Sequence, residues 1–67
     1  MNVTVNNKIE VLPDMETTLA ELLAQKGIGR GGVAVALNDR IVRHSKWEET
    51  ILKEGDSIVI ISAAFGG

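Results

Sequence analysis

The segment SIVIIS, residues 57–62, contains an apolar run of four residues at its centre, and all four are β-branched. Valine and isoleucine favour strands because their branched Cβ fits a pleated, packed surface. Glu54, Gly55 and Asp56 precede this segment and are typical of a turn. We therefore expect a strand at residues 57–62, and its high apolar content predicts a place in the middle of a sheet.

The first twelve residues predict a hairpin that packs with this strand. Val3 and Val5 alternate with polar residues, and residues 8–11 repeat the alternation after the pair Asn6-Asn7. Asparagine tolerates positive φ better than other residues that carry a Cβ, so such a pair suits a tight turn. Pro13 then ends the second strand because it has no backbone N–H to donate.

A helix is predicted at residues 18–26. Thr18 and Glu21 have the spacing of a capping box, in which each side chain accepts a hydrogen bond from a free backbone N–H. Leu19, Leu22 and Leu23 form one apolar stripe, which is the pattern of a helix packed on a core. Gly27 follows as a suitable C-terminal cap.

The second half of the chain predicts a further hairpin and a short helical turn. Residues 31–37 carry no charge, so we expect a strand that is covered on both sides or nearly so. Residues 38–40 are typical of a turn, and residues 41–42 of a short returning strand. Residues 45–48 repeat the capping-box pattern, in a segment long enough for one turn of helix.

In this chain of 67 residues these elements predict one α+β domain with the order β-β-α-β-β-turn-β. We expect a mixed sheet of four or five strands wrapped around one main helix. The domain comprises residues 1–62, and residues 63–67 form a flexible C-terminal tail. The predicted core consists of Leu19, Leu22, Leu23, Val35, Ile58 and Ile60.

Composition excludes several classes of function. The net charge is −2, the basic residues are scattered, and the chain has one Trp, one Phe and no Tyr, which argues against nucleic-acid binding. The longest apolar run is far shorter than a membrane span, and the first residues lack the pattern of a signal peptide. We expect a cytoplasmic protein that is monomeric when free and contacts neither membrane nor nucleic acid.

Catalytic and metal-binding constellations are not expected either. The chain has no Cys and a single His, so it cannot form a structural zinc site. His44 and Ser45 are neighbours in sequence and point in different directions, which does not suit a nucleophile and its base, so we interpret His44 as a solvated loop residue. Glu48 and Glu49 are likewise adjacent and cannot face each other across a substrate. We expect no catalytic residue, no metal site and no cofactor bound by this chain.

Gly27, Gly29 and Gly32 match the spacing G-x-G-x-x-G. A dinucleotide-binding fingerprint follows a strand and opens a helix, whereas this one follows a helix and opens a strand. We interpret it as a loop.

The most distinctive feature is the end of the sequence, AAFGG at residues 63–67. The last charged side chain is that of Asp56, and five residues can extend about 17 Å at ~3.3 Å per residue. Two glycines can thread a narrow channel, and a carboxylate held there can be converted by ATP into an acyl-adenylate. A frayed terminus remains the simpler interpretation of these residues taken alone.

In its whole length the chain resembles the ubiquitin-like β-grasp family, and within it the sulfur carriers of thiamin biosynthesis. The stretches that carry the resemblance are residues 1–5, 6–8, 18–23, 33–42, Trp47, 52–58 and the pair Gly66-Gly67. Each stretch is short, and their order along the chain gives the resemblance its specificity.

The resemblance implies a carrier that is adenylated at Gly67 by an adenylyltransferase of the ubiquitin-activating type, which uses ATP and magnesium. A persulfide of a cysteine desulfurase, or another sulfur donor, then supplies the sulfur of a C-terminal thiocarboxylate, and thiazole synthase receives it. Phe65, Gly66 and Gly67 would enter the active site of the partner.

Two alternatives stay open at this point. One is a carrier for molybdopterin, tRNA thiolation or cysteine synthesis, and the other is a non-covalent binding module. Arg40, Arg43 and Lys46 form a candidate partner surface, although a solvated loop is the simpler explanation of these residues. Phe65 either packs back on the sheet or anchors in a partner, and we favour the anchor.

Overall fold

The computed structural model describes residues 1–13, 16–29 and 31–62. Their order is β1 (Asn2–Val5), β2 (Lys8–Val11), α1 (Leu19–Gln25), β3 (Val33–Leu37), β4 (Arg40–Val42), the 3₁₀ helix η1 (His44–Glu49) and β5 (Ser57–Ser62). This sequence of elements confirms the predicted one. The predicted boundary after residue 62 and the flexible tail at residues 63–67 concern positions outside the described residues.

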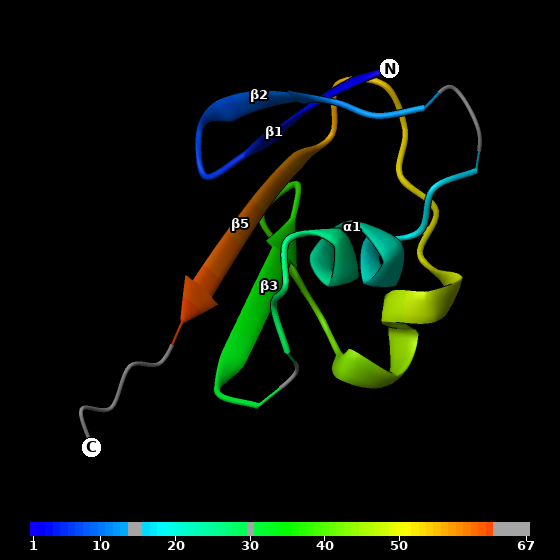
Figure 1. Ribbon diagram of the computed structural model, residues 1–67. Coiled ribbons are helices and arrows are strands. Elements are labelled where there is room, and N and C mark those ends of the chain that lie inside the picture. The colour runs from blue at the N-terminus through cyan, green and yellow to red at the C-terminus, as the bar shows by residue number, and fades with distance from the viewer. Residues whose placement is uncertain (14–15, 30, 63–67) are drawn as a thin grey trace.

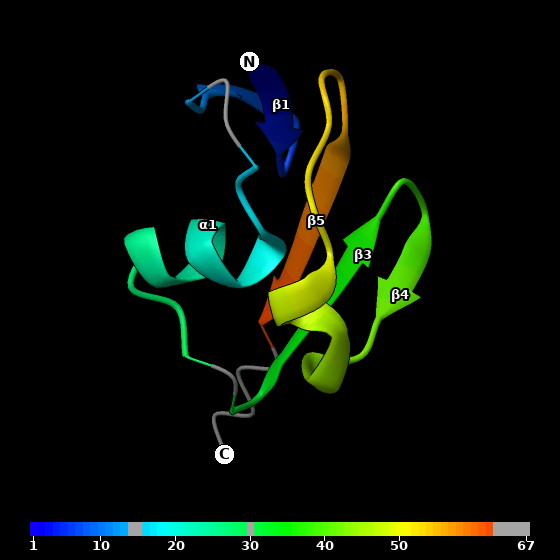
Figure 2. The same cartoon turned by 90° about the vertical axis from the view of Figure 1, so that its right-hand side faces the viewer.

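The five strands form one mixed sheet with the order β2-β1-β5-β3-β4. β5 pairs parallel with β1 and antiparallel with β3, so it occupies the centre of the sheet as its sequence predicts. In Figure 2, β1, β5, β3 and β4 follow one another across the sheet. Figure 1 shows α1 and the yellow-green turns of η1 on one side of β3 and β5.

The core lies between the sheet and the two helices. Five of the six predicted core residues are fully buried, and Ile60 is half-buried and packs against them. Five further buried apolar side chains complete the cluster: Val3, Val5, Leu12, Trp47 and Leu52.

The ends of α1 are built as the sequence predicts. The N–H of Glu21 donates to Thr18 Oγ1 at 3.1 Å, and the N–H of Thr18 donates to Glu21 Oε1 at 2.8 Å, which completes the capping box. Gly27 has φ +72°, and its N–H donates to the carbonyl of Ala24. The N–H of Ile28 donates to the carbonyl of Leu23, and together these two bonds form a Schellman motif.

Both hairpin turns use polar residues with positive φ. Asn6 and Asn7 have φ 51° and 69°, and Asn38 and Asp39 have φ 50° and 71°. These values suit the two-residue turns whose twist matches that of the strands. The side chain of Asn6 has a second role, because its Oδ1 accepts the N–H of Ile60 at 2.8 Å. This bond gives the N–H of Ile60 an acceptor at a point where β1 has already ended.

The double role of Asn6 can be tested by comparison with Asn7. We expect Asn6→Gly to lower the unfolding free energy by about 1 kcal/mol, because glycine keeps the positive φ but loses the bond to Ile60. Asn7→Gly, which removes a side chain with no such bond to β5, should be neutral or slightly stabilising. Urea unfolding of both variants measures the difference, and equal stabilities would exclude the proposed role of the Asn6 side chain.

Candidate functional site

The segment that the sequence singles out, Phe65 to Gly67, lies outside the described residues. What the structure describes is the strand that precedes it. β5 is paired with β1 at its start and with β3 along its length, where Ser62 lies opposite Val33. Ile58 in this strand is completely buried. The candidate site is therefore connected to the most firmly held strand of the sheet.

The start of β5 is fixed by a cluster of side-chain hydrogen bonds that sequence reasoning missed. Asn38 Nδ2 donates to Asp56 Oδ1 at 3.0 Å, and the N–H of Ser57 donates to Asn38 Oδ1 at 2.9 Å. Asp56 is buried, and its second oxygen accepts the N–H of Lys53 at 2.7 Å. The only signal in the sequence was that Asn38 and Asp56 are turn residues, which does not predict that two distant turns bind each other.

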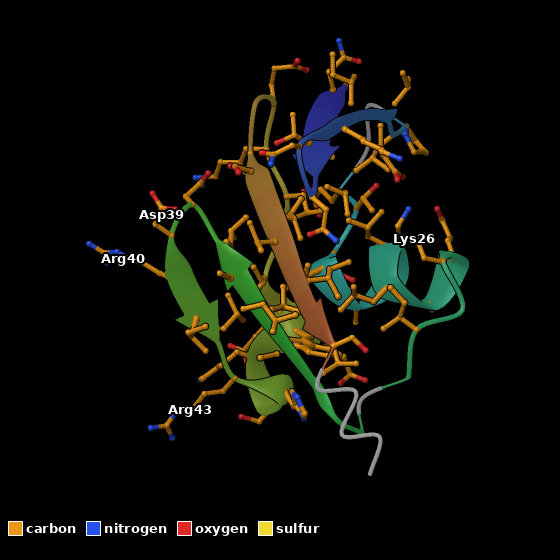
Figure 3. The ribbon with its side chains drawn as sticks, turned by 90° about the vertical axis from the view of Figure 1, so that its left-hand side faces the viewer. Lys26, Asp39, Arg40 and Arg43 are labelled. Atoms are coloured by element: carbon orange, nitrogen blue, oxygen red, sulfur yellow. The ribbon has the colours of Figure 1, made fainter. Side chains whose placement is uncertain are left out.

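The structure places the three residues of the predicted basic surface on strand β4, at its end and on η1. Arg40 is the first residue of β4, and Arg43 follows the last one. Figure 3 shows both side chains extending away from the body of the molecule at the β4 edge. Lys46 lies on η1, where its ammonium is 3.8 Å from the carboxylate of Glu49. We call Arg40 and Arg43 the basic edge.

An apolar surface on the sheet lies next to the basic edge. In the register of the sheet, Ala36 lies opposite both Ile41 and Val59, and Ala34 lies opposite Ile61. Paired residues share a face, so these five side chains gather on the face that does not carry the helices. We call them the outer-face patch. Ile41 and Ile61 are more than half exposed.

This patch corrects one expectation. The strand at residues 31–37 was expected to be covered on both sides, and this is wrong, because α1 and η1 both pack on one face of the sheet. Val35 points into the core, whereas Ala34 and Ala36 are only half-buried on the other face. An uncharged strand of this length can be half-exposed when its outward residues are small.

An open groove of about 590 Å³ lies between α1 and η1. Leu23, Ala24, Ile28 and Trp47 line it, and the exposed side chain of Glu48 lies at its rim. Glu49 is exposed as well. The glycine-rich segment that the sequence flagged connects α1 to β3, which confirms its interpretation as a loop.

His44 has a structural contact that the sequence did not predict. Its Nε2 lies 2.7 Å from the carbonyl oxygen of Val33, and its ring centroid lies 4.6 Å from that of Trp47. Trp47 Nε1 in turn donates to the carbonyl of Val42 at 3.0 Å. His44 is exposed, as expected, but it begins η1 and ties that helix to β3 instead of lying in a loop.

Two other kinds of site are absent from the part of the chain that the structure describes. No group of three or more His, Asp or Glu side chains there gathers closely enough to hold a metal ion. None of the helices in residues 1–13, 16–29 and 31–62 has the length and apolar character needed to cross a bilayer.

Comparison with known proteins gives one consistent family. The model of the ThiS family matches residues 2–67. The sulfur carrier protein ThiS of Escherichia coli (strain K12) is 36% identical over 50 residues, which cover 75% of this chain and 76% of that protein.

Two solved structures of one thiamine biosynthesis protein from Geobacter metallireducens are also similar. Its crystal structure, described as ThiS, superimposes with a TM-score of 0.82 at 29% identity and covers 100% of both chains. The second, solved by NMR in solution, gives a TM-score of 0.73 at 28% identity over 91% of this chain and 81% of that one. A match over nearly the whole sequence and the same mixed sheet around one helix lead to one conclusion: the chain belongs to the ThiS family.

Proposed function

We propose that this protein is a sulfur carrier for thiamine biosynthesis and that the carboxylate of Gly67 is the group that carries the sulfur. The similarity to the Escherichia coli sulfur carrier protein ThiS is the observation that carries the proposal. The glycine pair at residues 66 and 67 supports it, since the family model extends over both residues. A carrier of this kind is a co-substrate of its partners and has no turnover of its own.

The proposed reaction has two stages. In the first, a ubiquitin-activating-type adenylyltransferase holds ATP and magnesium, and an oxygen of the Gly67 carboxylate attacks the α-phosphorus. The bond between the α- and β-phosphates breaks, pyrophosphate leaves, and an acyl-adenylate forms.

In the second stage, the terminal sulfur of a cysteine-desulfurase persulfide attacks the acyl carbon and displaces AMP. A thiol then reduces the resulting S–S bond and releases the thiocarboxylate. Thiazole synthase receives this sulfur, and each cycle returns the Gly67 carboxylate.

The carrier contributes position and recognition to this chemistry. We propose that Phe65 and Gly66 enter the active site of the partner together with Gly67, and that Phe65 anchors there. The outer-face patch and the basic edge lie on β3, β4 and β5, and β5 is the strand that precedes this segment in the chain. A partner with an apolar surface bordered by carboxylates would contact both at once.

Mass spectrometry of the intact chain tests the proposal. The protein is incubated with a ThiS-adenylating enzyme, ATP, magnesium, a cysteine desulfurase and cysteine. We expect a gain in mass equal to the replacement of one oxygen by sulfur, located in the C-terminal peptide, and its loss after addition of thiazole synthase and its substrates. The Escherichia coli carrier serves as positive control. Conversion of the control without conversion of this chain would refute the proposal.

The basic edge makes a separate prediction. The double variant Arg40→Glu, Arg43→Glu should raise the KM of the adenylyltransferase for the carrier about tenfold at low salt and leave kcat unchanged, since charges at the rim of an interface act mainly on encounter. The effect should decrease at high salt. Lys46→Glu is the control, because Lys46 lies beside Glu49 on η1. An equal rise in KM for Lys46→Glu would show a general charge effect and no specific edge.

A further inference from the structure

Strand β2 carries its apolar side chains on the wrong face for a core. Its partner register puts Lys8 and Glu10 on the same face as the buried Val5 and Val3. Ile9 and Val11 therefore point to the opposite face, where they are 73% and 77% exposed. No other large apolar side chain among the described residues is as exposed. Among the described residues β2 pairs with β1 alone, and this pairing does not explain why its apolar side chains are exposed.

The backbone of β2 presents a free edge at the same two residues. Met1 and Leu12 exchange two hydrogen bonds, of 2.6 Å and 2.7 Å, and antiparallel pairs alternate between bonded and non-bonded. Ile9 and Val11 therefore lie at non-bonded positions, and their N–H and C=O groups point away from β1. In the described part of the chain no strand lies beyond β2. Such an edge is a template for another strand.

We propose that two copies of this chain pair antiparallel through their β2 edges, with Ile9 of one copy opposite Ile9 of the other. The charges of β2 favour a second copy of the same strand as the partner, and they favour this register. With Ile9 on the two-fold axis, Lys8 of each copy lies opposite Glu10 of the other, on the same face of the sheet. Directly opposed residues have Cβ atoms about 5 Å apart, so both unlike pairs are in reach.

The charges of β2 also exclude the register that is shifted by one residue. With Glu10 on the axis, two carboxylates would lie directly opposite each other, which is destabilising. The ammonium of Lys26, which is labelled in Figure 3, already contacts Glu10 from the end of α1. In the Ile9 register, each Glu10 therefore lies between its own Lys26 and Lys8 of the other copy. The pairing is self-complementary in charge and joins the exposed isoleucines.

The other edge of the sheet is a poorer template. β4 has three residues, and the chain leaves the sheet at Arg43 to enter η1. The β2 edge is also short, and four residues per copy bury less than the roughly 800 Å² per partner of a stable complex. We therefore expect a weak dimer, with the monomer as the form in dilute solution. Because β5 lies two strands away from β2, this pairing is independent of the proposed function.

Charge reversal tests the register. Sedimentation velocity from about 20 µM to 2 mM at low salt should show concentration-dependent dimerisation of the wild type. Lys8→Glu and Glu10→Lys should each weaken it at least tenfold, because each places like charges opposite one another. A mixture of the two variants should dimerise at least as well as the wild type. In the mixed dimer, positions 8 and 10 are both acidic in one copy and both basic in the other, so both opposed pairs are unlike. Lys46→Glu makes the same charge change on η1 and should dimerise normally.

Proline substitution tests the edge itself. The N–H of Ile9 points to the free edge, so Ile9→Pro removes a donor to the second copy and leaves the β1 ladder intact. Ile41→Pro is the matched control, since Ile41 lies at the equivalent position beside the two-residue turn of β3 and β4. Thermal melts verify that both variants fold.

The expected result is that Ile9→Pro loses the dimer and Ile41→Pro retains it. A wild type that stays monomeric at 2 mM, a mixture of charge variants that stays monomeric, or a dimer lost through Ile41→Pro would each overturn the proposal.

Discussion

Deletion of Gly67 is expected to abolish formation of the thiocarboxylate while it leaves the unfolding free energy unchanged. This expectation rests on the proposed function. Glycine has no side chain to pack in a core, so the loss of the last residue should cost little stability. Removal of one residue withdraws the terminal carboxylate by about 3.3 Å, and a misplacement of ~1 Å can cost on the order of a hundredfold in rate.

Intact-mass spectrometry in the reconstituted reaction, together with a thermal melt, measures both effects. Ala64→Gly is the control, because it keeps the length and the small side chains of the segment and should be converted normally. Gly66→Val tests a different cause: its branched Cβ restricts the backbone and obstructs a narrow channel, so conversion should be slow at full length. Conversion of the Gly67 deletion at the rate of the wild type would show that the position of the carboxylate is irrelevant, and the proposed function would fail.

Leu22→Ala should have the largest effect on stability. Leu22 is 1% exposed and lies in the centre of the apolar stripe of α1, against the sheet. Truncation of a buried leucine costs about 2–5 kcal/mol through lost burial and the cavity that remains. Domains of this size are stable by roughly 5 kcal/mol, so the variant should be largely unfolded near 37 °C.

Urea unfolding at low protein concentration measures this loss. Val11→Ala is the control, because it removes comparable apolar volume from a side chain that is 77% exposed, and it should change the free energy by less than about 0.5 kcal/mol. Equal midpoints for the two variants would contradict the assignment of Leu22 to the core.

The local elements could be predicted because the residues that decide them are close in sequence. The capping box needs only Thr18 and Glu21, and the first hairpin turn needs only Asn6 and Asn7. The strength of β5 follows from its own β-branched run. The composition of β5 predicted its central place, but the full order β2-β1-β5-β3-β4 did not follow from such local patterns.

The missed parts of the core and of the site depend on contacts between distant residues. Trp47 lies in the charged segment of η1, where a single apolar residue gives no periodicity, yet its ring is 1% exposed and its Nε1 donates to Val42. Lys46 was grouped with the two arginines by sequence distance, whereas η1 places it beside Glu49. Ile9 and Val11 alternate as a core strand does, and only the register shows that they face outward.

The central position of β5 has a consequence for the kinetics of folding. The hairpins β1–β2 and β3–β4 each close over two residues and can form within about 1–10 µs. The parallel pairing of β1 with β5 joins residues from nearly opposite ends of the sequence, and such non-local pairings are slow because the entropy of a long loop is lost before contacts form. We therefore expect the rate-limiting event of folding to be the insertion of β5 between two preformed hairpins. Until that event, β1 and β3 each expose an unpaired edge, and this interval is the one in which a chaperone or an aggregate competes for the chain.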